Sequence, residues 1–425
     1  MRPDMIDLPP FGVGTAAIGN LYRVVTDAEA RSTIAAAIAA GIGYFDTAPH
    51  YGHGLAERRL GDALAELDPD TMAVVSTKVG RLLEPTTARG DRHGFVDADP
   101  FEPVFDYTAD GIRRSVDASR QRLRRDRIDI LLAHDLGVRT HGAEHARHLR
   151  DFLESGYPAM VALRETGDVG AIGIGVNEID ICHALIDRVD LDAILLAGRY
   201  TLLDRSAAAL LDRCRERGVR VIVGGPYNSG ILARDPTERD PARAHYDYAA
   251  PSSEMVERTR TLATQCAAFD VALPAAALQF PLRHPAVVCV VAGVVGEGEV
   301  DDLAARAAVP IPKELWMALG ADDARVGREQ LMLLHPDDNV LICVSPIAVG
   351  DILTVSGGTI ASREGIAVGH KIARRHLAAG EKVIKYGAPI GSMTADAAGG
   401  EWIHLHNMKS DYIAGHTRSA TNEPS

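Results

Sequence analysis

Residues 44–54 read YFDTAPHYGHG, an apolar run that leads into a turn carrying an Asp, a His and a Tyr. The aromatic start is typical of a short buried strand, and the two glycines favour a tight turn because glycine adopts positive φ without steric cost. Asp46 and Tyr51 therefore have two interpretations. They are a cap and a loop residue in an ordinary turn, or they are side chains placed for chemistry at a strand end.

Seven further short apolar runs occur before residue 310, and stretches with helical periodicity separate them. The eight runs begin at residues 11, 44, 74, 129, 171, 193, 221 and 287. Strands that alternate with helices predict βα units and a parallel sheet, and eight such units make a (β/α)8 TIM barrel. A doubly wound sheet gives a similar pattern, but no GxGxxG follows an early strand. We predict an α/β fold with a TIM barrel over residues 1–310.

The pattern changes after about residue 310 to short runs rich in Gly, Val and Ile, separated by turn residues. This pattern predicts a small, mostly β domain over residues 325–415. The polar residues 416–425 are predicted to form a flexible tail.

The composition limits the classes of function. A formal net charge of -13 argues against non-specific nucleic-acid binding and against attachment to anionic membranes. The first residues lack the apolar core of a signal peptide and no run reaches a membrane span, so we predict a cytoplasmic protein. Five scattered cysteines without CxxC spacing predict buried thiols with no metal or redox role. Small molecules or protein partners remain.

Polar side chains stand at three consecutive predicted strand ends: Asp46 and Tyr51, then Lys78, then His134. A barrel would bring them to its carboxyl-terminal mouth. A phenol has a pKa of about 10, so Tyr51 needs a nearby ammonium such as Lys78 for proton transfer. Asp46 would hold Lys78, and His134 would donate to the substrate oxygen. Each residue also has an ordinary structural interpretation, but their joint placement favours catalysis.

The stretches FDTAPHYGHGLAERRLG, STKVGR and DILLAHD, with GTAAIGNLYR and LLAGRYTLLD, resemble the aldo-keto reductase family over residues 8–306. The likeness is to its D-threo-aldose 1-dehydrogenase type, also called L-fucose or galactose dehydrogenases. It implies that Tyr51 is the acid/base, that Lys78 and Asp46 set its pKa, and that His134 orients the substrate beside His50. The implied reaction is oxidation of an aldose at C1 to an aldonolactone.

The resemblance also implies a nicotinamide cofactor across the barrel mouth. Asn177 matches the residue that binds the carboxamide, although a helix N-cap is an equal interpretation. Tyr200 matches the aromatic that stacks on the nicotinamide, while Ala197 stands where the family often has Gln. The other cofactor residues implied are Gly225, Pro226 and Gly230 in the pyrophosphate loop, and Gly293 at the end of the eighth strand.

The loop after the eighth strand bears on the choice between NAD and NADP. It carries Glu297, Glu299, Asp301 and Asp302 and has no Lys or Arg before Arg306. Acids would repel a 2'-phosphate, so we predict NAD, with NADP as the alternative if a distant arginine reaches in.

The segments GHKIA, VIKYGAPIG and HLHN resemble the SAF domain of altronate and galactarate dehydratases. The large catalytic part of those enzymes is not predicted here, so we expect no dehydratase activity from this chain alone. His404, His406 and Asn407, with His370 and Lys371, form a polar cluster. We expect it to contact a carboxylate ligand or a partner such as a dehydratase large subunit, and a purely structural role stays open.

The leading prediction is thus an NAD-preferring aldose 1-dehydrogenase with an appended domain. One alternative is an accessory subunit of a sugar-acid dehydratase, and another is a general NADPH-dependent carbonyl reductase. Substrate selection is expected in the long loop at 80–107, where Phe101 or Phe105 would pack on an apolar sugar face.

Overall fold

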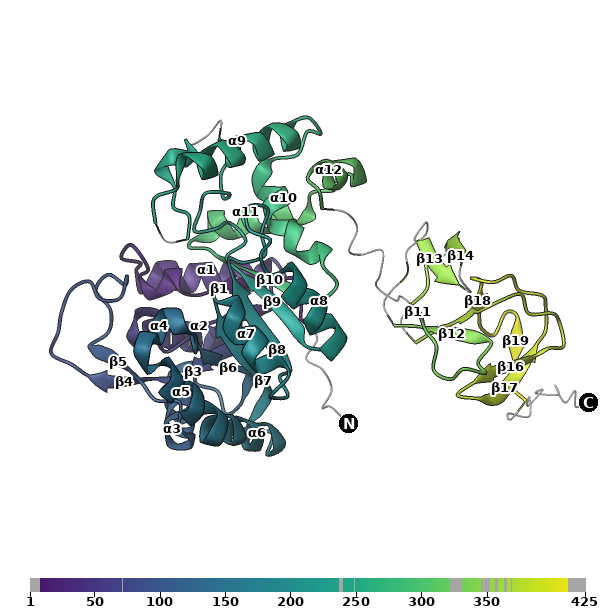
Figure 1. Ribbon diagram of the computed structural model, residues 1–425, viewed down its shortest axis with the longest axis horizontal. Coiled ribbons are helices and arrows are strands. Elements are labelled where there is room, and N and C mark those ends of the chain that lie inside the picture. Colours follow the sequence, from purple (N-terminus) through teal and green to yellow (C-terminus); the bar gives the residue numbers. More distant parts are fainter. Residues whose placement is uncertain are drawn as a thin grey trace, which may run out of the picture. The chain divides into compact units, whose positions relative to one another are not determined.

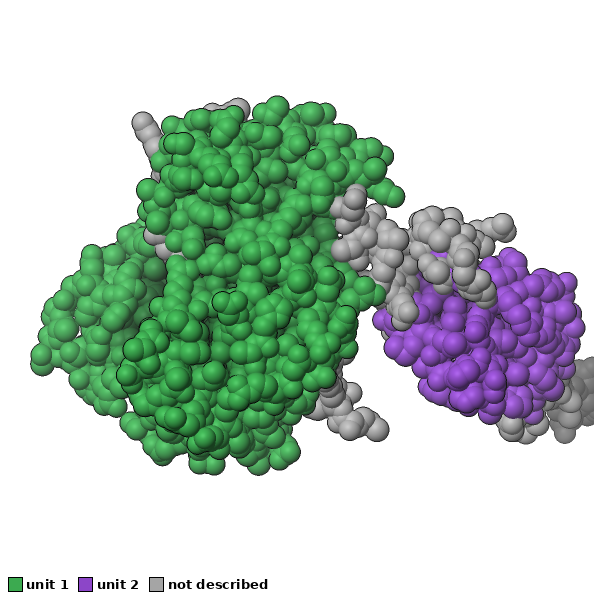
Figure 2. Space-filling model, viewed as in Figure 1, with its two compact units in different colours: residues 1–326 green, residues 327–425 purple. Residues whose placement is uncertain are grey.

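The computed structural model describes residues 8–70, 72–236, 240–247, 249–321, 331–344, 347, 352–355, 358–362, 365–367 and 369–411. The chain divides into two compact units, residues 1–326 and residues 327–425 (Figure 2). The first unit is called the barrel unit and the second the small unit.

The barrel unit contains a closed barrel of eight parallel strands in the order β1-β10-β9-β8-β7-β6-β3-β2 (Figure 1). The strands are β1 Phe11–Gly14, β2 Tyr44–Asp46, β3 Val74–Val79, β6 Ile128–His134, β7 Val169–Val176, β8 Ala193–Ala197, β9 Arg220–Gly224 and β10 Val287–Gly293. The predicted (β/α)8 barrel is confirmed, and all eight predicted strands are present.

Helices surround the barrel in Figure 1. They are α1 Asp27–Ala39, α2 Leu55–Leu67, α3 Ala109–Leu123, α4 Val138–His141, α5 His145–Asp151, α6 Tyr157–Glu165, α7 Ile179–Ile186, α8 Ala208–Arg217, α9 Ser253–Ala267, α10 Leu273–Gln279, α11 Glu297–Ala308 and α12 Lys313–Ala318. Thr26, Thr108 and Ser252 cap α1, α3 and α9, because each hydroxyl accepts from a backbone N–H in the first turn. Local sequence therefore sets where these helices begin.

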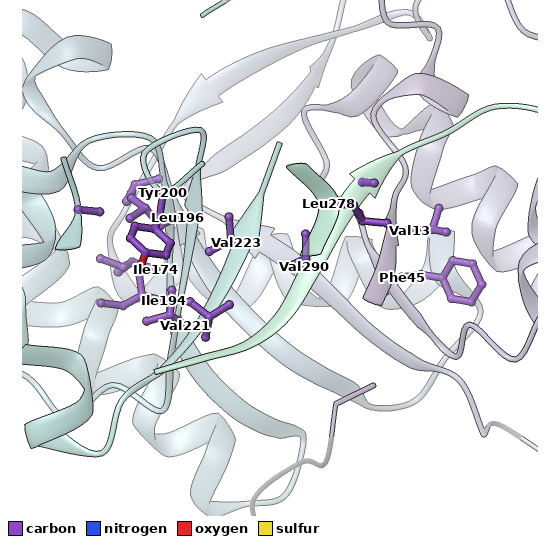
Figure 3. Packing of buried hydrophobic residues seen from close by; sticks show 14 of the residues in the cluster. Val13, Phe45, Ile174, Ile194, Leu196, Tyr200, Val221, Val223, Leu278 and Val290 are labelled. Carbon is purple, nitrogen blue, oxygen red and sulfur yellow. The ribbon is translucent and has the colours of Figure 1, made fainter. Parts of the chain in front are cut away.

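Two layers of apolar side chains hold the barrel together because strand side chains alternate between its two faces. The interior is filled by Tyr44, Ile130, Leu132, Leu195, Ile222, Cys289 and Val291. The outer layer packs between the strands and the helices, and Figure 3 shows part of it, including Val13, Phe45, Ile174 and Leu196. The same alternation puts His134 on the inward face with Ile130 and Leu132, at the carboxyl end of β6.

The long loop at 80–107 contains an antiparallel pair of strands, β4 Arg81–Pro85 and β5 Phe101–Phe105. Toward the carboxyl terminus of the barrel unit, α12 follows the predicted boundary at residue 310, and its Leu315 and Trp316 are buried. The barrel unit is thus longer than residues 1–310.

The small unit is mostly β, as predicted, and has two hydrophobic clusters of its own. Its strands are β11 Leu331–Met332, β12 Val340–Cys343, β13 Ile352–Val355, β14 Gly358–Ala361, β15 Lys371–Ala373, β16 Lys382–Lys385, β17 Ala388–Met393, β18 Trp402–Ile403 and β19 Met408–Lys409. They form sheets β11-β12-β15-β18, β13-β14 and β16-β17-β19. The predicted tail, residues 416–425, lies outside the described residues.

Within the described ranges, no helix combines the length and apolar character needed to cross a membrane. All five cysteines are free and buried, as predicted.

Candidate active site

Asp46, Lys78 and Tyr51 meet at the carboxyl-terminal mouth of the barrel. Asp46 ends β2 and Lys78 lies near the end of the adjacent β3. The Lys78 Nζ donates to Asp46 Oδ2 at 2.8 Å, to the Thr47 carbonyl at 2.8 Å and to the Tyr51 hydroxyl at 3.1 Å. The lysine is 1% exposed and the aspartate 4%. Two side chains that are far apart in sequence therefore make a buried ion pair in contact with the phenol.

Burial and neighbouring charges shift the pKa values of Lys78 and Tyr51. Burial disfavours the Lys78 ammonium, but the charges and hydrogen bonds of Asp46 and Tyr51 outweigh it and raise the lysine pKa above its usual value. Burial likewise raises the pKa of Tyr51 above its usual value, and the Lys78 charge lowers it only in part. The expected influence of the lysine is present, but the phenol is more weakly acidic than the sequence suggested.

A hydrogen-bonded chain inside the barrel holds the aspartate. Ser76 Oγ donates to Asp46 Oδ1 at 2.7 Å, and the Tyr44 hydroxyl lies 2.8 Å from the same serine. Both oxygens of the Asp46 carboxylate are thus occupied, Oδ1 by Ser76 and Lys78 and Oδ2 by Lys78. Sequence reasoning missed Ser76, although its place two residues before Lys78 puts both side chains on the same face of β3.

The segment after β2 turns sharply at Tyr51–Gly54, where Gly52 and Gly54 have φ of 63° and 102°. A Cβ on Gly52 would overlap the backbone at Gly19, so the close approach of these two segments also requires glycine. The turn then begins α2, in agreement with the tight turn predicted for these glycines.

His134, at the end of β6, lies beside the phenol, and its ring centroid is 6.1 Å from that of Tyr51. The imidazole is 6% exposed. Its Nε2 lies 3.5 Å from Asp135 Oδ2, and the Tyr107 hydroxyl donates to its backbone carbonyl at 2.5 Å. Burial lowers the His134 pKa well below its usual value, and the nearby positive charges of Arg81 and Lys78 add to the effect. The ring is therefore neutral and can donate only one hydrogen bond.

Aromatic rings form one wall beside the phenol. The His50 ring lies 6.0 Å from the ring of His134, and the Phe95 ring lies 6.2 Å from that of Tyr51. Phe95 is 3% exposed. We expected the loop at 80–107 to contribute Phe101 or Phe105 to the site.

The aromatic next to Tyr51 is instead Phe95, a residue that the sequence alone did not indicate. Phe105 lies against His141, with ring centroids 4.5 Å apart, and under the guanidinium of Arg81 at 5.1 Å. No periodic pattern in an irregular loop distinguishes Phe95 from the other two phenylalanines.

The glycines predicted to line the cofactor site lie at the carboxyl ends of β9 and β10. Gly225 and Gly230 have φ of 61° and 106°, and open space surrounds the position of a Cβ on Gly230. Gly293 pairs with Gly14 in β1 and is exposed. Pro226, next to Gly225, is buried. These glycines leave backbone accessible to an extended ligand such as a dinucleotide.

Asn177 follows β7 at the same mouth. The N-cap residue of α7 is Glu178, so the cap interpretation of Asn177 is wrong. The Asn177 backbone carbonyl accepts from Arg199 Nε at 2.8 Å. A role in binding a carboxamide stays a prediction.

Tyr200 is not brought to the catalytic group. Its ring packs against Phe280 and His284, with centroids 5.1 Å and 5.7 Å away, in the outer hydrophobic layer (Figure 3). A stacking role on nicotinamide stays a prediction. The sequence suggested the role from a motif position, and the motif does not determine which way the loop after β8 turns.

Acidic residues gather where α11 begins after β10. Glu297 and Glu299 lie in its first turn, and Glu299 Oε2 accepts from the backbone N–H of Val295 at 2.8 Å. Arg306 pairs with Asp302 at 3.1 Å. Arg306 also lies over the ring of Tyr227, at 5.8 Å from its centroid. Arg306, the first cation of this segment, therefore already contacts Asp302 and Tyr227.

The predicted polar cluster of the small unit is aromatic in character. The rings of Trp402 and His404 stack at 5.1 Å, and the Trp402 Nε1 donates to His370 Nδ1 at 3.2 Å. His406 lies 5.4 Å from Trp402. Lys371 is half-buried, and burial lowers its pKa. Asn407 serves the turn itself, since its Oδ1 accepts from the His404 backbone N–H at 3.0 Å.

Each unit matches a known protein family in sequence. Residues 10–321 match the model of the aldo/keto reductase family, and residues 329–411 match that of the altronate/galactarate dehydratase SAF domain. A D-threo-aldose 1-dehydrogenase from a Pseudomonas species is 40% identical over 319 residues, which span 73% of this chain and 93% of the relative. A pyridoxal 4-dehydrogenase from Microbacterium luteolum is 39% identical, with the same coverage.

For the small unit, an altronate dehydratase from Escherichia coli is 39% identical over 82 residues, 19% of this chain but only 17% of that enzyme. Among solved structures, the fold is similar to an aldo-keto reductase from Bacillus halodurans, with a TM-score of 0.58 and 24% identity. That similarity covers 75% of this chain and 93% of the other. The family uses nicotinamide cofactors, and the chain belongs to the aldo/keto reductase family, with a SAF domain following the barrel.

Proposed function

We propose that the barrel unit oxidises an aldose at C1 to its lactone, with Tyr51 as the acid/base. The observation that carries this proposal is the contact of the Tyr51 hydroxyl with the buried Lys78 ammonium, which Asp46 holds in turn. This arrangement stabilises a phenolate at a place where a sugar hydroxyl can reach it.

The protein's own residues handle one proton in this reaction. Tyr51, as phenolate, takes the proton of the C1 hydroxyl. A nicotinamide cofactor, when bound, would supply the acceptor for the hydride that leaves C1. His134 donates from one ring nitrogen to the C1 oxygen and orients it, and His50 lines the substrate side. Run in reverse, Tyr51 returns the proton and a carbonyl is reduced.

For the cofactor we propose that Asn177 binds the carboxamide and that Gly225, Pro226, Gly230 and Gly293 lie along the dinucleotide. The acids at the start of α11 favour NAD over NADP because they repel a 2'-phosphate. A Glu297→Arg variant should therefore raise the ratio of kcat/KM for NADP over NAD by about tenfold, the effect of one charge-assisted contact. An unchanged ratio would show that this loop does not contact the adenosine ribose.

Two relatives of nearly equal identity act on different compounds, an aldose and pyridoxal. Both compounds can close to a cyclic hemiacetal, since each has an aldehyde and a hydroxyl within reach, and oxidation of a hemiacetal gives a lactone. We favour an aldose. Pyridoxal oxidation is the second candidate, and the pyridoxal 4-dehydrogenase, whose identity to this chain is nearly as high, supports it.

The test measures nicotinamide reduction by the full chain with NAD or NADP. The substrates are L-fucose, D-arabinose, L-galactose, L-xylose and pyridoxal, and Tyr51→Phe is the control. Sugar oxidation that disappears in the variant supports the proposal, and activity with pyridoxal alone selects the second candidate. Turnover of simple aldehydes with NADPH and of no sugar would indicate a general carbonyl reductase. No turnover of any compound would favour an accessory subunit.

For the small unit we propose a recognition role toward a sugar-acid carboxylate or a dehydratase large subunit. The identity to altronate dehydratase supports it, together with the ring cluster of His370, Trp402 and His404. The lactone made by the barrel hydrolyses to an acid of this class. A pull-down in which the full chain retains no sugar-acid dehydratase, and titrations in which no aldonate binds, would contradict this role.

A further inference from the structure

Asp135 follows His134 directly and adopts a left-handed backbone conformation, with φ of 46°. Few residues other than glycine adopt this region, and Asp and Asn do so more often than most. The Asp135 backbone N–H donates to the Gly175 carbonyl at 2.9 Å, so the strand pairing continues up to this residue before the chain turns. An unfavourable conformation therefore occurs directly beside the catalytic group.

The carboxylate of Asp135 is held in the mouth of the barrel by two contacts. Its Oδ2 pairs with the guanidinium of Arg81 and lies 3.5 Å from His134 Nε2. The ring of Phe105 lies under that guanidinium. The side chain of Arg81 is 10% exposed and that of Asp135 is 21% exposed. Both contacts use Oδ2, and Oδ1 is a second acceptor on a partly exposed carboxylate.

This carboxylate is close enough to act on the reacting group. The Asp135 charge is among the causes that raise the pKa of Tyr51. Burial raises the pKa of Asp135 above its usual value, and the charges of Arg81 and Lys78 oppose that shift only in part. The Arg81 pair therefore favours an anion at the substrate end of the site.

We propose that Asp135, held by Arg81, accepts a hydrogen bond from the substrate hydroxyl next to the reacting carbon. The inference rests on the proposed function. The C1 oxygen accepts a hydrogen bond from His134 Nε2, and the neighbouring sugar oxygen lies within hydrogen-bond distance of the first. Asp135, 3.5 Å from the same nitrogen, is placed to accept from that second hydroxyl. The substrate class is then a 2-hydroxyaldose, and 2-deoxy sugars and simple aldehydes lack the recognised group.

The experiment compares D-arabinose with 2-deoxy-D-ribose, which differ only by the oxygen at C2. The full chain is assayed for kcat/KM on both sugars as wild type, Asp135→Asn and Asp135→Ala. Asparagine tolerates the left-handed backbone, so this variant removes the charge with little change of conformation. We expect the preference for D-arabinose to fall about 10- to 100-fold in Asp135→Ala, the effect of losing one hydrogen bond to a charged group, and less in Asp135→Asn.

Asp168→Ala is the matched control, since Asp168 pairs with Arg120 at 2.8 Å just before β7, at the opposite end of the barrel. The control should keep the wild-type preference. If Asp135→Ala melts at a lower temperature, the double variant Arg81→Met/Asp135→Ala removes both charges and should show the same fall in preference.

An equal loss on both sugars would overturn the inference, because Asp135 would then only position His134. A wild-type chain that oxidises other sugars but prefers neither test sugar would also overturn it. A chain that oxidises no sugar fails the proposed function itself, and the two failures are therefore distinguishable.

Discussion

The two units treat polar side chains differently. In the barrel, Lys78 and Asp46 form an ion pair that is almost fully buried, at 2.8 Å. In the small unit, Trp402 and His404 stack while half-buried. The pair of Lys382 with Asp411, at 2.7 Å, is much more exposed, at 59% for the lysine side chain and 28% for the aspartate.

The buried pair of the barrel suits acid/base chemistry, whereas the half-exposed rings of the small unit suit recognition. Removal of water strengthens charge interactions and shifts pKa values, which is what an acid/base group requires. Half-exposed rings instead offer a contact surface to a ligand or partner.

The largest effect is expected for Tyr51→Phe, which removes the proposed acid/base. We expect kcat/KM for sugar oxidation to fall by about 10² to 10⁴, measured by nicotinamide absorbance, with an unchanged melting temperature. Tyr157→Phe is the matched control, because Tyr157 lies in α6 and bonds the backbone of Asp190 away from the mouth. Retention of wild-type activity in Tyr51→Phe would show that Tyr51 is not the acid/base of the barrel site.

Lys78→Met should lower the free energy of unfolding by about 3–5 kcal/mol, since it leaves the Asp46 carboxylate buried without its cation. The comparison variant is Lys382→Met in the small unit, where an exposed pair contributes at most about 1 kcal/mol. Urea unfolding measures both. Equal losses in the two variants would contradict the contrast between the units.

Lys78→Met also tests the coupling of the lysine to the phenol. Oxidation requires the phenolate, so wild-type activity should rise with pH through the alkaline range, because burial raises the Tyr51 pKa. The Lys78 charge lowers that pKa, and its removal should move the rise to still higher pH. A pH profile of kcat/KM with the same midpoint in both proteins would rule out this coupling.

A pH effect on stability is expected in the barrel. Burial lowers the pKa of His50 to about 2 and that of His53 to about 4, from an unfolded value of 6.5. The unfolded chain then binds more protons below pH 6.5, so stability falls as the pH decreases toward the folded values. Each such histidine contributes about 1.4 kcal/mol per pH unit in that window.

Urea unfolding at pH 7.0, 6.0 and 5.0 checks this slope for the barrel transition. His53→Gln should make the slope shallower by about one proton. A free energy of unfolding that does not change across this range would show that these histidines are protonated in the folded barrel.

The smallest effect is expected for Trp402→Ala in the small unit. It removes the ring on which His370 and His404 pack, yet sugar oxidation by the barrel should stay within about twofold of wild type because each unit has its own core. The same variant should weaken retention of a sugar-acid dehydratase in a pull-down. A large loss of oxidation would show that the two units do not work separately.

Much of the site was predictable because local pattern encodes it. Hydrophobic runs alternating with helical periodicity indicated eight βα units, and the carboxyl ends of parallel strands meet at one edge. Asp46, Lys78 and His134 at three strand ends were therefore expected to converge, and the structure brings them together with Tyr51.

The strand number, the turn after β2 and the set of polar residues at the mouth can be predicted from the sequence, because each depends on period or on glycine. Tertiary packing alone places Phe95 beside Tyr51, packs Tyr200 into the outer layer and pairs Arg81 with Asp135 beside His134. These contacts join irregular loops to distant strands. Their geometry depends on how distant segments pack against one another, and no local sequence pattern carries that information.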